Sequence, residues 1–95
     1  MSEPLFSFRL YIAGDAENSL AAIANLRQLC ERYLPGRHRV EVVDVLHEPL
    51  RALADGIFMT PMLVKLTPAP VRRIVGSLSQ LAIVLQALNL PPQPA

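Results

Sequence analysis

The residues of this chain that could act as nucleophiles or metal ligands are few and scattered. Cys30 is the only cysteine, and His38 and His47 are the only histidines. A compact metal site needs closely spaced Cys, His or carboxylate ligands, and no such spacing surrounds either histidine. We therefore predict no metal site and interpret both histidines as surface residues.

The hydroxyl groups and glycines form no catalytic motif either. Ser19, Ser77 and Ser79 have no recognisable nucleophile motif or base partner, and their neighbours suit helix caps better. The four glycines stand at separate turns, so the sequence has no glycine-rich phosphate loop. These features predict that the protein is not an enzyme and binds no cofactor.

Length and composition favour one small globular domain. The 95 residues are 52% hydrophobic and 18% charged, which suits a core of about residues 5–90 followed by a proline-rich tail, 91–95. The net charge of +1 argues against a dedicated nucleic-acid binder. No apolar run approaches the roughly 20 residues of a membrane span, and Glu3 and Arg9 interrupt any signal peptide, so we expect no membrane contact and a cytoplasmic location.

Charge is unevenly distributed along the chain. All acidic residues lie between Glu3 and Asp55, whereas residues 56–95 carry only Lys65, Arg72 and Arg73. These three cations predict a small basic surface that binds an anion or an acidic partner. A solvated face without a partner is the alternative.

Hydrophobic periodicity predicts alternating strands and helices. Alternating apolar residues indicate strands, and apolar residues three or four apart indicate helices. A helix is the usual connection between parallel neighbours, and a short proline-containing loop suits an antiparallel hairpin. In chain order we predict a strand over 5–12, a helix over 17–34 capped by Asn18 or Ser19, an interior strand over 40–46, a helix over 49–54, strands over 62–66 and 71–75, and a helix from a Ser77 or Ser79 cap to Asn89.

This order, βαβ-α-ββ-α, predicts an α/β protein with a thioredoxin-like sheet covered by helices on both faces. An oxidoreductase of this fold needs a cysteine at the start of the first helix, where the helix dipole favours a thiolate. That segment reads AGDAENS, and we expect Cys30 to be a small core residue rather than a sensor thiol. Thr60-Pro61 stands where this architecture places a cis peptide bond facing an extended ligand; a trans proline opening a strand is the alternative.

Four stretches of the sequence resemble the KaiB family of clock-associated proteins from cyanobacteria and other bacteria. They are TPMLVKLTPAPVRRIVGSLS at 60–79, LYIAG at 10–14, Asn18-Ser19, and VVDVL at 42–46. The resemblance implies a non-enzymatic regulator that binds the ring ATPase KaiC, in a clock or stress-response system, and that captures KaiA in the complete clock. It also implies that Lys65, Arg72 and Arg73 bind the partner. Because neighbours in a strand point to opposite faces, we expect only one of Arg72 and Arg73 to contact a given partner.

KaiB-like proteins adopt two folds, and the resemblance extends this property to the chain. A thioredoxin-like monomer binds the partner, while an alternative packing of the C-terminal half, in the order βαββααβ, forms tetramers. The region expected to switch includes Pro68, Pro70, Ala87 and Asn89. Because Ala87 replaces a family glycine and favours a helix, we predict the thioredoxin-like packing, as a monomer or a small homo-oligomer such as a dimer.

Several positions depart from the cyanobacterial pattern. Gly56 replaces a lysine, Ala21 replaces an arginine, Asn89 replaces an aspartate, and residues 91–95 replace an acidic tail. KaiC is therefore the expected partner, and KaiA capture is left open.

Two other functions are open at this point. Thr60-Pro61 and the segment 77–80 lie where glutathione-binding or transferase-like domains of this fold hold a peptide-like ligand. The detached input domain of a KaiB-like sensor kinase also shares the fold.

Overall fold

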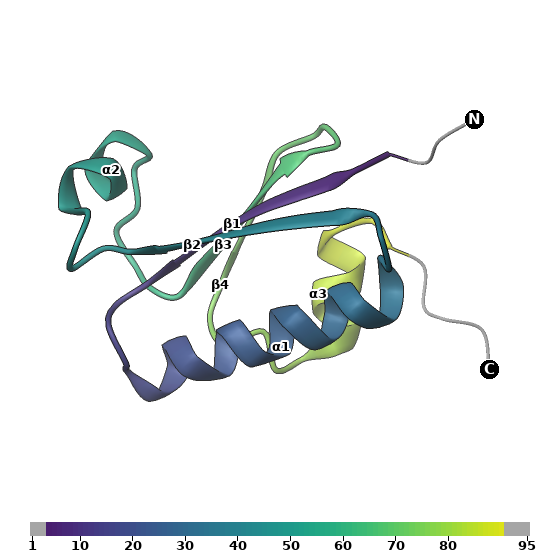
Figure 1. Cartoon of the computed structure of the whole chain (residues 1–95), viewed down its shortest axis with the longest axis horizontal. Coiled ribbons are helices and arrows are strands. Elements are labelled where there is room, and N and C mark those ends of the chain that lie inside the picture. Colours follow the sequence, from purple (N-terminus) through teal and green to yellow (C-terminus); the bar gives the residue numbers. More distant parts are fainter. Residues whose placement is uncertain (1–3, 91–95) are drawn as a thin grey trace.

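Strand β1 (Phe6–Ile12) lies in the interior of the sheet, and it contributes buried apolar side chains to both faces. The computed structural model describes residues 4–90. In it, β1 pairs in parallel with β2 (His38–Asp44) and antiparallel with β3 (Met62–Thr67), which pairs antiparallel with β4 (Arg72–Val75). The resulting strand order is β2-β1-β3-β4 (Figure 1).

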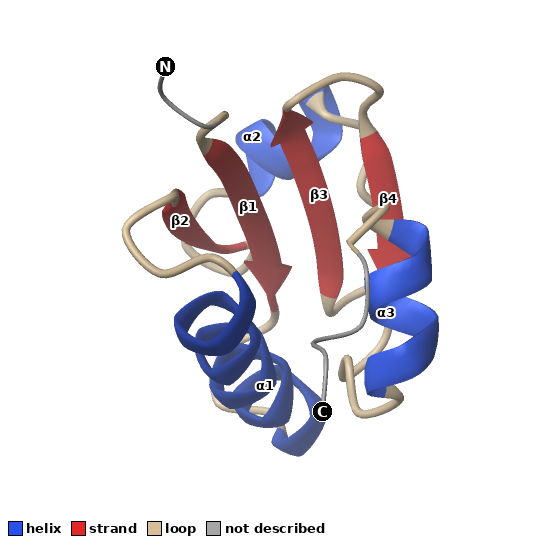
Figure 2. Cartoon of the chain, turned by 90° about the vertical axis from the view of Figure 1, so that its right-hand side faces the viewer, coloured by secondary structure: helices blue, strands red, loops and turns tan. Residues whose placement is uncertain are grey.

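Helices cover both faces of this sheet. The long helix α1 (Glu17–Tyr33) and the short helix α3 (Leu81–Ala87) lie on one face, and α2 (Pro49–Ala54) lies on the other (Figure 2). The predicted order βαβ-α-ββ-α and the antiparallel hairpin of β3 and β4 are confirmed. None of the helices in residues 4–90 has the length and apolar character that crossing a bilayer requires.

Two hydrophobic cores follow from the alternation along β1. Phe8 and Leu10 point into the core beneath α1 and α3, and Tyr11 points into a smaller core beneath α2. Cys30 belongs to the larger core and is 1% exposed. The smaller core consists of Tyr11, Val43, Ala52, Ile57, Met62 and Val64.

The expectation that residues 40–46 form an interior strand is wrong. The strand begins at His38 and ends at Asp44, and it lies at the edge of the sheet. Val43 is buried, but Val40 and Val42 are 38% and 44% exposed. The β-branched run predicted a strand correctly, but β propensity does not distinguish an edge position from a central one.

The predicted helix caps are also wrong. Ala16 is the N-cap of α1 and Gln80 is that of α3, and neither side chain caps its helix. Ser19 is buried inside α1, and its Oγ accepts a hydrogen bond from the Ala13 N–H at 3.1 Å. Ser77 and Ser79 precede α3 without capping it.

Of the residues assigned to fold switching, Ala87 is helical in this structure, and Asn89 follows the end of that helix. Pro68 and Pro70 lie in the connection between β3 and β4, where both follow cis peptide bonds. Helix α3 ends at Ala87, two residues before the predicted end at Asn89. The alternative packing is thus not the one observed, and the predicted proline-rich tail lies outside the described residues.

A Schellman motif closes α3. The Leu90 N–H donates to the Leu85 carbonyl at 2.8 Å, and the Asn89 N–H donates to the Gln86 carbonyl at 3.1 Å. This geometry needs a left-handed residue after the cap, and Asn89 has φ of +59°. Asparagine tolerates that conformation better than most residues do, so the residue that replaces the family aspartate suits the helical form.

We predict that Ala87→Gly shifts the chain toward the alternative packing. Glycine in a helix costs up to about 1 kcal/mol relative to alanine, which changes a two-state ratio about fivefold. The matched control is Ala54→Gly at the last position of α2. Backbone chemical shifts should become more strand-like over residues 81–88 in the first variant alone; identical shifts in the two variants would contradict the prediction.

Candidate protein-docking surface

The segment before α1 holds no nucleophile. The Gly14 N–H donates to Asp44 Oδ1 at 3.1 Å, which ties this turn to the end of β2. Cys30 lies farther along α1, and burial, helped by the nearby charge of Glu31, raises the pKa of its thiol to about 12. Because the thiolate is the reactive form, Cys30 is unreactive near neutral pH.

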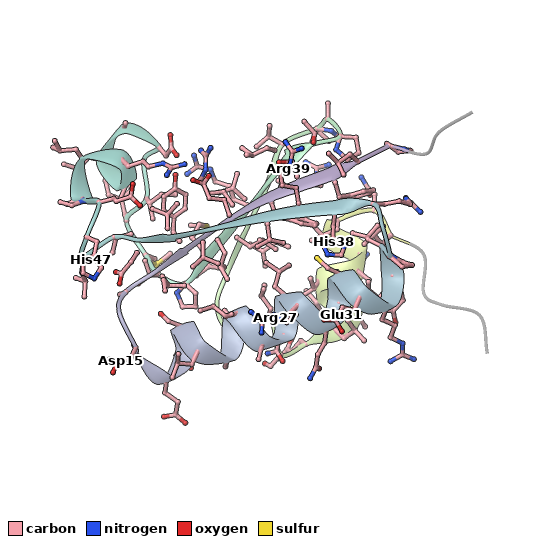
Figure 3. All side chains as sticks on the ribbon, in the orientation of Figure 1. Asp15, Arg27, Glu31, His38, Arg39 and His47 are labelled. Carbon is pink, nitrogen blue, oxygen red and sulfur yellow. The ribbon has the colours of Figure 1, made fainter. Side chains whose placement is uncertain are left out.

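The two histidines lie at opposite ends of β2 (Figure 3). His38 Nδ1 is 2.7 Å from the Leu34 carbonyl oxygen, so this nitrogen carries the proton. His47 is exposed, and its Nε2 is 3.6 Å from Asp44 Oδ2. Across residues 4–90, no three His, Cys, Asp or Glu side chains are grouped so that they could hold a metal ion.

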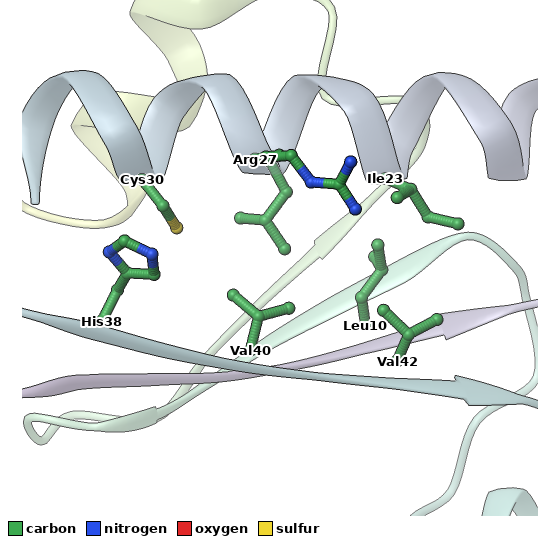
Figure 4. A pocket seen from close by; sticks show the side chains of 8 residues that line it. Leu10, Ile23, Arg27, Cys30, His38, Val40 and Val42 are labelled. Atoms are coloured by element: carbon green, nitrogen blue, oxygen red, sulfur yellow. The ribbon is translucent and has the colours of Figure 1, made fainter. Parts of the chain in front are cut away.

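A groove of about 300 Å³ runs between α1 and the edge strand β2 (Figure 4). Its walls are mainly apolar, including Leu10, Ile23 and Val42. Its polar side chains are the exposed Arg27 and the half-buried His38. Specific small-molecule sites have several converging polar groups, and this groove does not.

The most prominent exposed apolar feature surrounds α2. Leu50 and Leu53 are 80% and 66% exposed, and Phe58 in the following loop is 86% exposed. Monomeric proteins seldom leave several large apolar side chains exposed together without a binding role. We call the following residues the α2 surface: Leu46, Leu50, Leu53, Phe58 and Met59.

Ion pairs join the elements that carry the α2 surface to the sheet. Arg9 on β1 contacts Glu41 on β2 at 3.0 Å and Asp55 after α2 at 3.1 Å. Arg51 on α2 contacts the same Glu41 carboxylate at 2.6 Å. The Tyr11 hydroxyl also donates to the Asp55 carboxylate. Since α2 buries little of its own surface, these polar contacts fix its position.

Arg73 completes this arrangement from β4. Its guanidinium donates to the carbonyl oxygens of Asp55 at 2.6 Å and Gly56 at 3.3 Å. Gly56 has φ of +68°, which favours glycine, so the turn after α2 is held by both backbone geometry and Arg73. Arg73 therefore positions the loop that presents Phe58.

Lys65, Arg72 and Arg73 do not share one exposed surface. Lys65 is only 2% exposed. It lies opposite Arg72 in the β3–β4 register, whereas Arg73 pairs with Val64 and reaches the α2 side. Arg72 and Arg73 thus face opposite sides of the sheet, as neighbours in a strand must. The prediction that Lys65 belongs to an exposed surface is wrong.

Thr60-Pro61 is a cis peptide bond immediately before β3. Pro61 is buried, and its carbonyl oxygen accepts a hydrogen bond from the Gly76 N–H at 2.9 Å. This oxygen is therefore engaged within the protein. Thr60 is half-buried and follows directly after Met59 of the α2 surface.

Sequence reasoning missed the α2 surface. The run from Leu46 to Met59 is rich in large apolar residues, but the only regular element inside it is the six-residue helix α2. A helix of fewer than two turns cannot bury apolar residues on several sides. The sequence therefore holds more large apolar residues here than so short a helix can bury, and this excess could have predicted an exposed apolar surface.

The fold and this surface define a class: a thioredoxin-like domain that lacks the cysteine at the first helix and presents an exposed apolar face beside α2. In fold alone, the N-terminal domain of SasA from Synechococcus elongatus matches this chain with a TM-score of 0.73 and 17% identity, over 100% of this chain and 93% of that chain. Mitochondrial thioredoxin 3 from Saccharomyces cerevisiae matches with a TM-score of 0.72 and 17% identity, over 93% and 81%. The thioredoxin-like fold is confirmed.

The chain belongs to the KaiB family. The KaiB domain matches residues 9–90. Circadian clock protein KaiB3 from Synechocystis sp. is 41% identical over 90% of this chain and 83% of the relative. The circadian clock oscillator protein KaiB from Prochlorococcus marinus is 44% identical over 90% and 71%. The resemblance seen in the sequence is confirmed, and the glutathione-binding alternative gains no support from these relatives.

We predict that Arg73→Gln loosens the loop after α2. The variant loses both donors to the Asp55 and Gly56 carbonyls, so native-state hydrogen exchange of amides 55–59 should speed up several-fold. Arg72→Gln removes the same charge from the other side of the sheet and should leave these amides unchanged. Equal exchange in both variants would show that Arg73 does not position the loop.

The Glu41 pairs predict a loss of stability in acid. Hydrogen bonds from Arg51 and Arg9 lower the pKa of Glu41 below its ordinary 4.5. Because the pKa of Glu41 is lower in the folded protein than in the unfolded chain, the Glu41 carboxylate stabilises the fold at pH values above its ordinary pKa. This stabilisation is lost as the pH falls through the lowered pKa of the folded protein. The free energy of unfolding of the wild type, measured with urea, should decrease below about pH 5 more steeply than that of the Glu41→Gln variant. Parallel curves would contradict the prediction.

Proposed function

We propose that this chain is a non-enzymatic regulatory protein that docks onto a KaiC-type ring ATPase in a clock or stress-response system. The observation that carries the proposal is the α2 surface. The chain's clock-protein relatives support a regulatory role, and the absence of a nucleophile before α1 is consistent with it.

The composition of the α2 surface suits the centre of a protein interface. Aromatic residues and methionine are enriched in such centres, and a few anchors there carry most of the binding energy. Phe58 is the candidate anchor, since it is the most exposed of the large apolar side chains. Leu50 and Leu53 add exposed aliphatic area to the α2 surface.

Charged side chains lie on the same segment as this apolar centre, and the rim of a typical interface is polar. Arg51 is paired with both Glu41 and Glu48. Such pairing holds α2 and its loop in place before the partner arrives, which reduces the ordering cost of binding.

The two cations of β4 are also proposed to contribute to partner binding. Arg72 and Arg73 are exposed and contribute a positive potential that favours an acidic partner surface. Because Lys65 is buried, we do not expect it to contact the partner directly; it can affect binding only by changing the structure of the sheet. KaiA capture is left open, and we place the protein in the cytoplasm.

The thioredoxin-like packing is the proposed binding form. It presents α2 and its loop on one side of the sheet while α3 is held by packing on the other. A monomer or a small homo-oligomer in this packing leaves the α2 surface free for the ring. Ala87 and Asn89 both favour this form over the alternative one.

The proposal is tested with the double variant Leu50→Ser/Phe58→Ser and a purified KaiC ring. Removing two large apolar contacts should weaken binding at least tenfold. The matched control is Val71→Ser/Ile83→Ser, at residues that are 56% and 58% exposed elsewhere on the molecule. Calorimetry or biolayer interferometry gives the affinities.

Two outcomes would count against the proposal. If the wild type does not bind a KaiC ring, the partner class is wrong. If the control pair weakens binding as much as the α2 pair while both variants keep the wild-type circular dichroism, the ring is bound by another surface.

A further inference from the structure

The outer edge of β2 is free to pair with another strand. β2 is the end strand of the sheet, and no strand of residues 4–90 lies beyond it (Figure 2). The Arg37 C=O and the Val45 N–H both bond to β1, each at 2.8 Å. Backbone polar groups of successive strand residues point to opposite edges. The N–H and C=O groups of His38, Val40 and Val42 therefore face outward.

The edge of β2 differs from the edge of β4 at the other end of the sheet. Natural edge strands are often protected by prolines, bulges or charges. β4 has four residues, and two of them are adjacent arginines, so two copies of β4 would bring like charges together. β2 has seven residues, no proline and an unbroken register with β1. Its two exposed charges, Arg39 and Glu41, have opposite signs and lie two residues apart on one face.

An antiparallel pair of β2 strands centred on Val40 suits both the backbone and these charges. In this register Val40 opposes Val40 and His38 opposes Val42, so all the outward backbone groups meet in hydrogen-bonded pairs. Arg39 then lies opposite Glu41 of the second copy, twice by symmetry, and opposite charges across a strand pair are stabilising. We propose that β2 docks onto β2 of a second copy of this chain, forming a two-fold symmetric dimer centred on Val40.

Neighbouring registers do not offer the same complementarity. A slip of one residue sets the outward backbone groups opposite residues that already bond to β1, so the ladder cannot form. A slip of two residues restores the hydrogen bonds but places Glu41 opposite Glu41 in one direction and Arg39 opposite Arg39 in the other. Like charges directly opposite each other are destabilising. The charges of β2 therefore select the register centred on Val40.

The side chains on the α1 face of β2 suit a dry contact. His38, Val40 and Val42 point toward α1 and line the groove between the helix and the strand (Figure 4). Val40 and Val42 are 38% and 44% exposed. In the dimer each of these three side chains has a cross-strand neighbour from the second copy. Pairing thus covers apolar area that the monomer leaves in water.

On the opposite face, Arg39 is available for an ion pair across the dimer. Arg39 is exposed and lies on the side of the sheet away from α1 (Figure 3). Within residues 4–90 it has no carboxylate partner. Arg9 and Arg51 hold the Glu41 carboxylate in position. A carboxylate accepts several hydrogen bonds, so Glu41 can also accept from Arg39 of the second copy.

The dimer is tested with the chain alone, so the result does not depend on the proposed docking onto a ring. Sedimentation velocity from about 10 µM to about 1 mM covers the range expected for a small interface. The wild type should show a monomer–dimer equilibrium. Arg39→Glu places two carboxylates opposite each other and should raise the dissociation constant about tenfold or more. Arg39→Lys is the matched control, because it keeps the cation, and its dissociation constant should stay within about threefold of the wild type.

Native-state hydrogen exchange of the wild type tests the register without a variant. At dimer-forming concentration the amides of His38, Val40 and Val42 should exchange several-fold more slowly than in a dilute sample. The amides of Arg39 and Glu41 face β1 and should be unaffected by concentration. This alternation distinguishes strand pairing from a general contact, and it can be measured even if Arg39→Glu fails to fold.

Three results would overturn the proposal. A wild type that stays monomeric at the highest concentration shows that β2 does not dock onto itself, which leaves a strand of a different protein as its occupant. Association that Arg39→Glu leaves unchanged, with wild-type circular dichroism, shows that the charges do not set the contact. Concentration-dependent protection at residues 50–59 in place of β2 shows that the copies meet through the α2 surface.

Discussion

The double-sided burial of β1 is the constraint on which the structure depends. Phe8 and Leu10 need cover on one face and Tyr11 needs it on the other. The long helix α1 and the helix α3 cover most of the first face. The second face has only the six-residue helix α2 and its loop. Incomplete cover on that side produces both the small second core and the exposed α2 surface.

On the α2 side of the sheet, polar contacts hold the helix in place, whereas on the other side buried hydrophobic area does so. Arg9, Glu41 and Asp55 connect β1, β2 and the loop, and Arg73 adds β4. Exposed ion pairs are individually weak, roughly 0–1 kcal/mol each, but a network gives specific geometry. The α2 surface can therefore keep a defined shape while its apolar side chains stay outside the core, which is the condition for docking a partner.

The sequence predicted what periodicity and turn chemistry determine. The element order, the hairpin and the buried Cys30 follow from local pattern, and the long 60–79 motif was sufficient to identify the family. The edge position of β2 could not be predicted, because it depends on which strands pair at a distance. At α1 the cap prediction failed because the Ser19 hydroxyl accepts from the Ala13 N–H in the preceding turn instead of capping the helix.

Charge was the least predictable feature, and Lys65 shows why. Strand alternation predicts that Arg72 and Arg73 face opposite sides of the sheet, as they do, but counting charges did not show that Lys65 is buried on the side of Arg72. The guanidinium of Arg73 donates hydrogen bonds to backbone carbonyls, whereas the amine of Lys65 lies near the Phe6 ring and is influenced by the charge of Arg72. Lys65 and Arg72 therefore lie on one face of the sheet, and Arg73 lies on the other. Changes at Lys65 and changes at the α2 surface therefore act on separate contacts, joined only through β3 and β4.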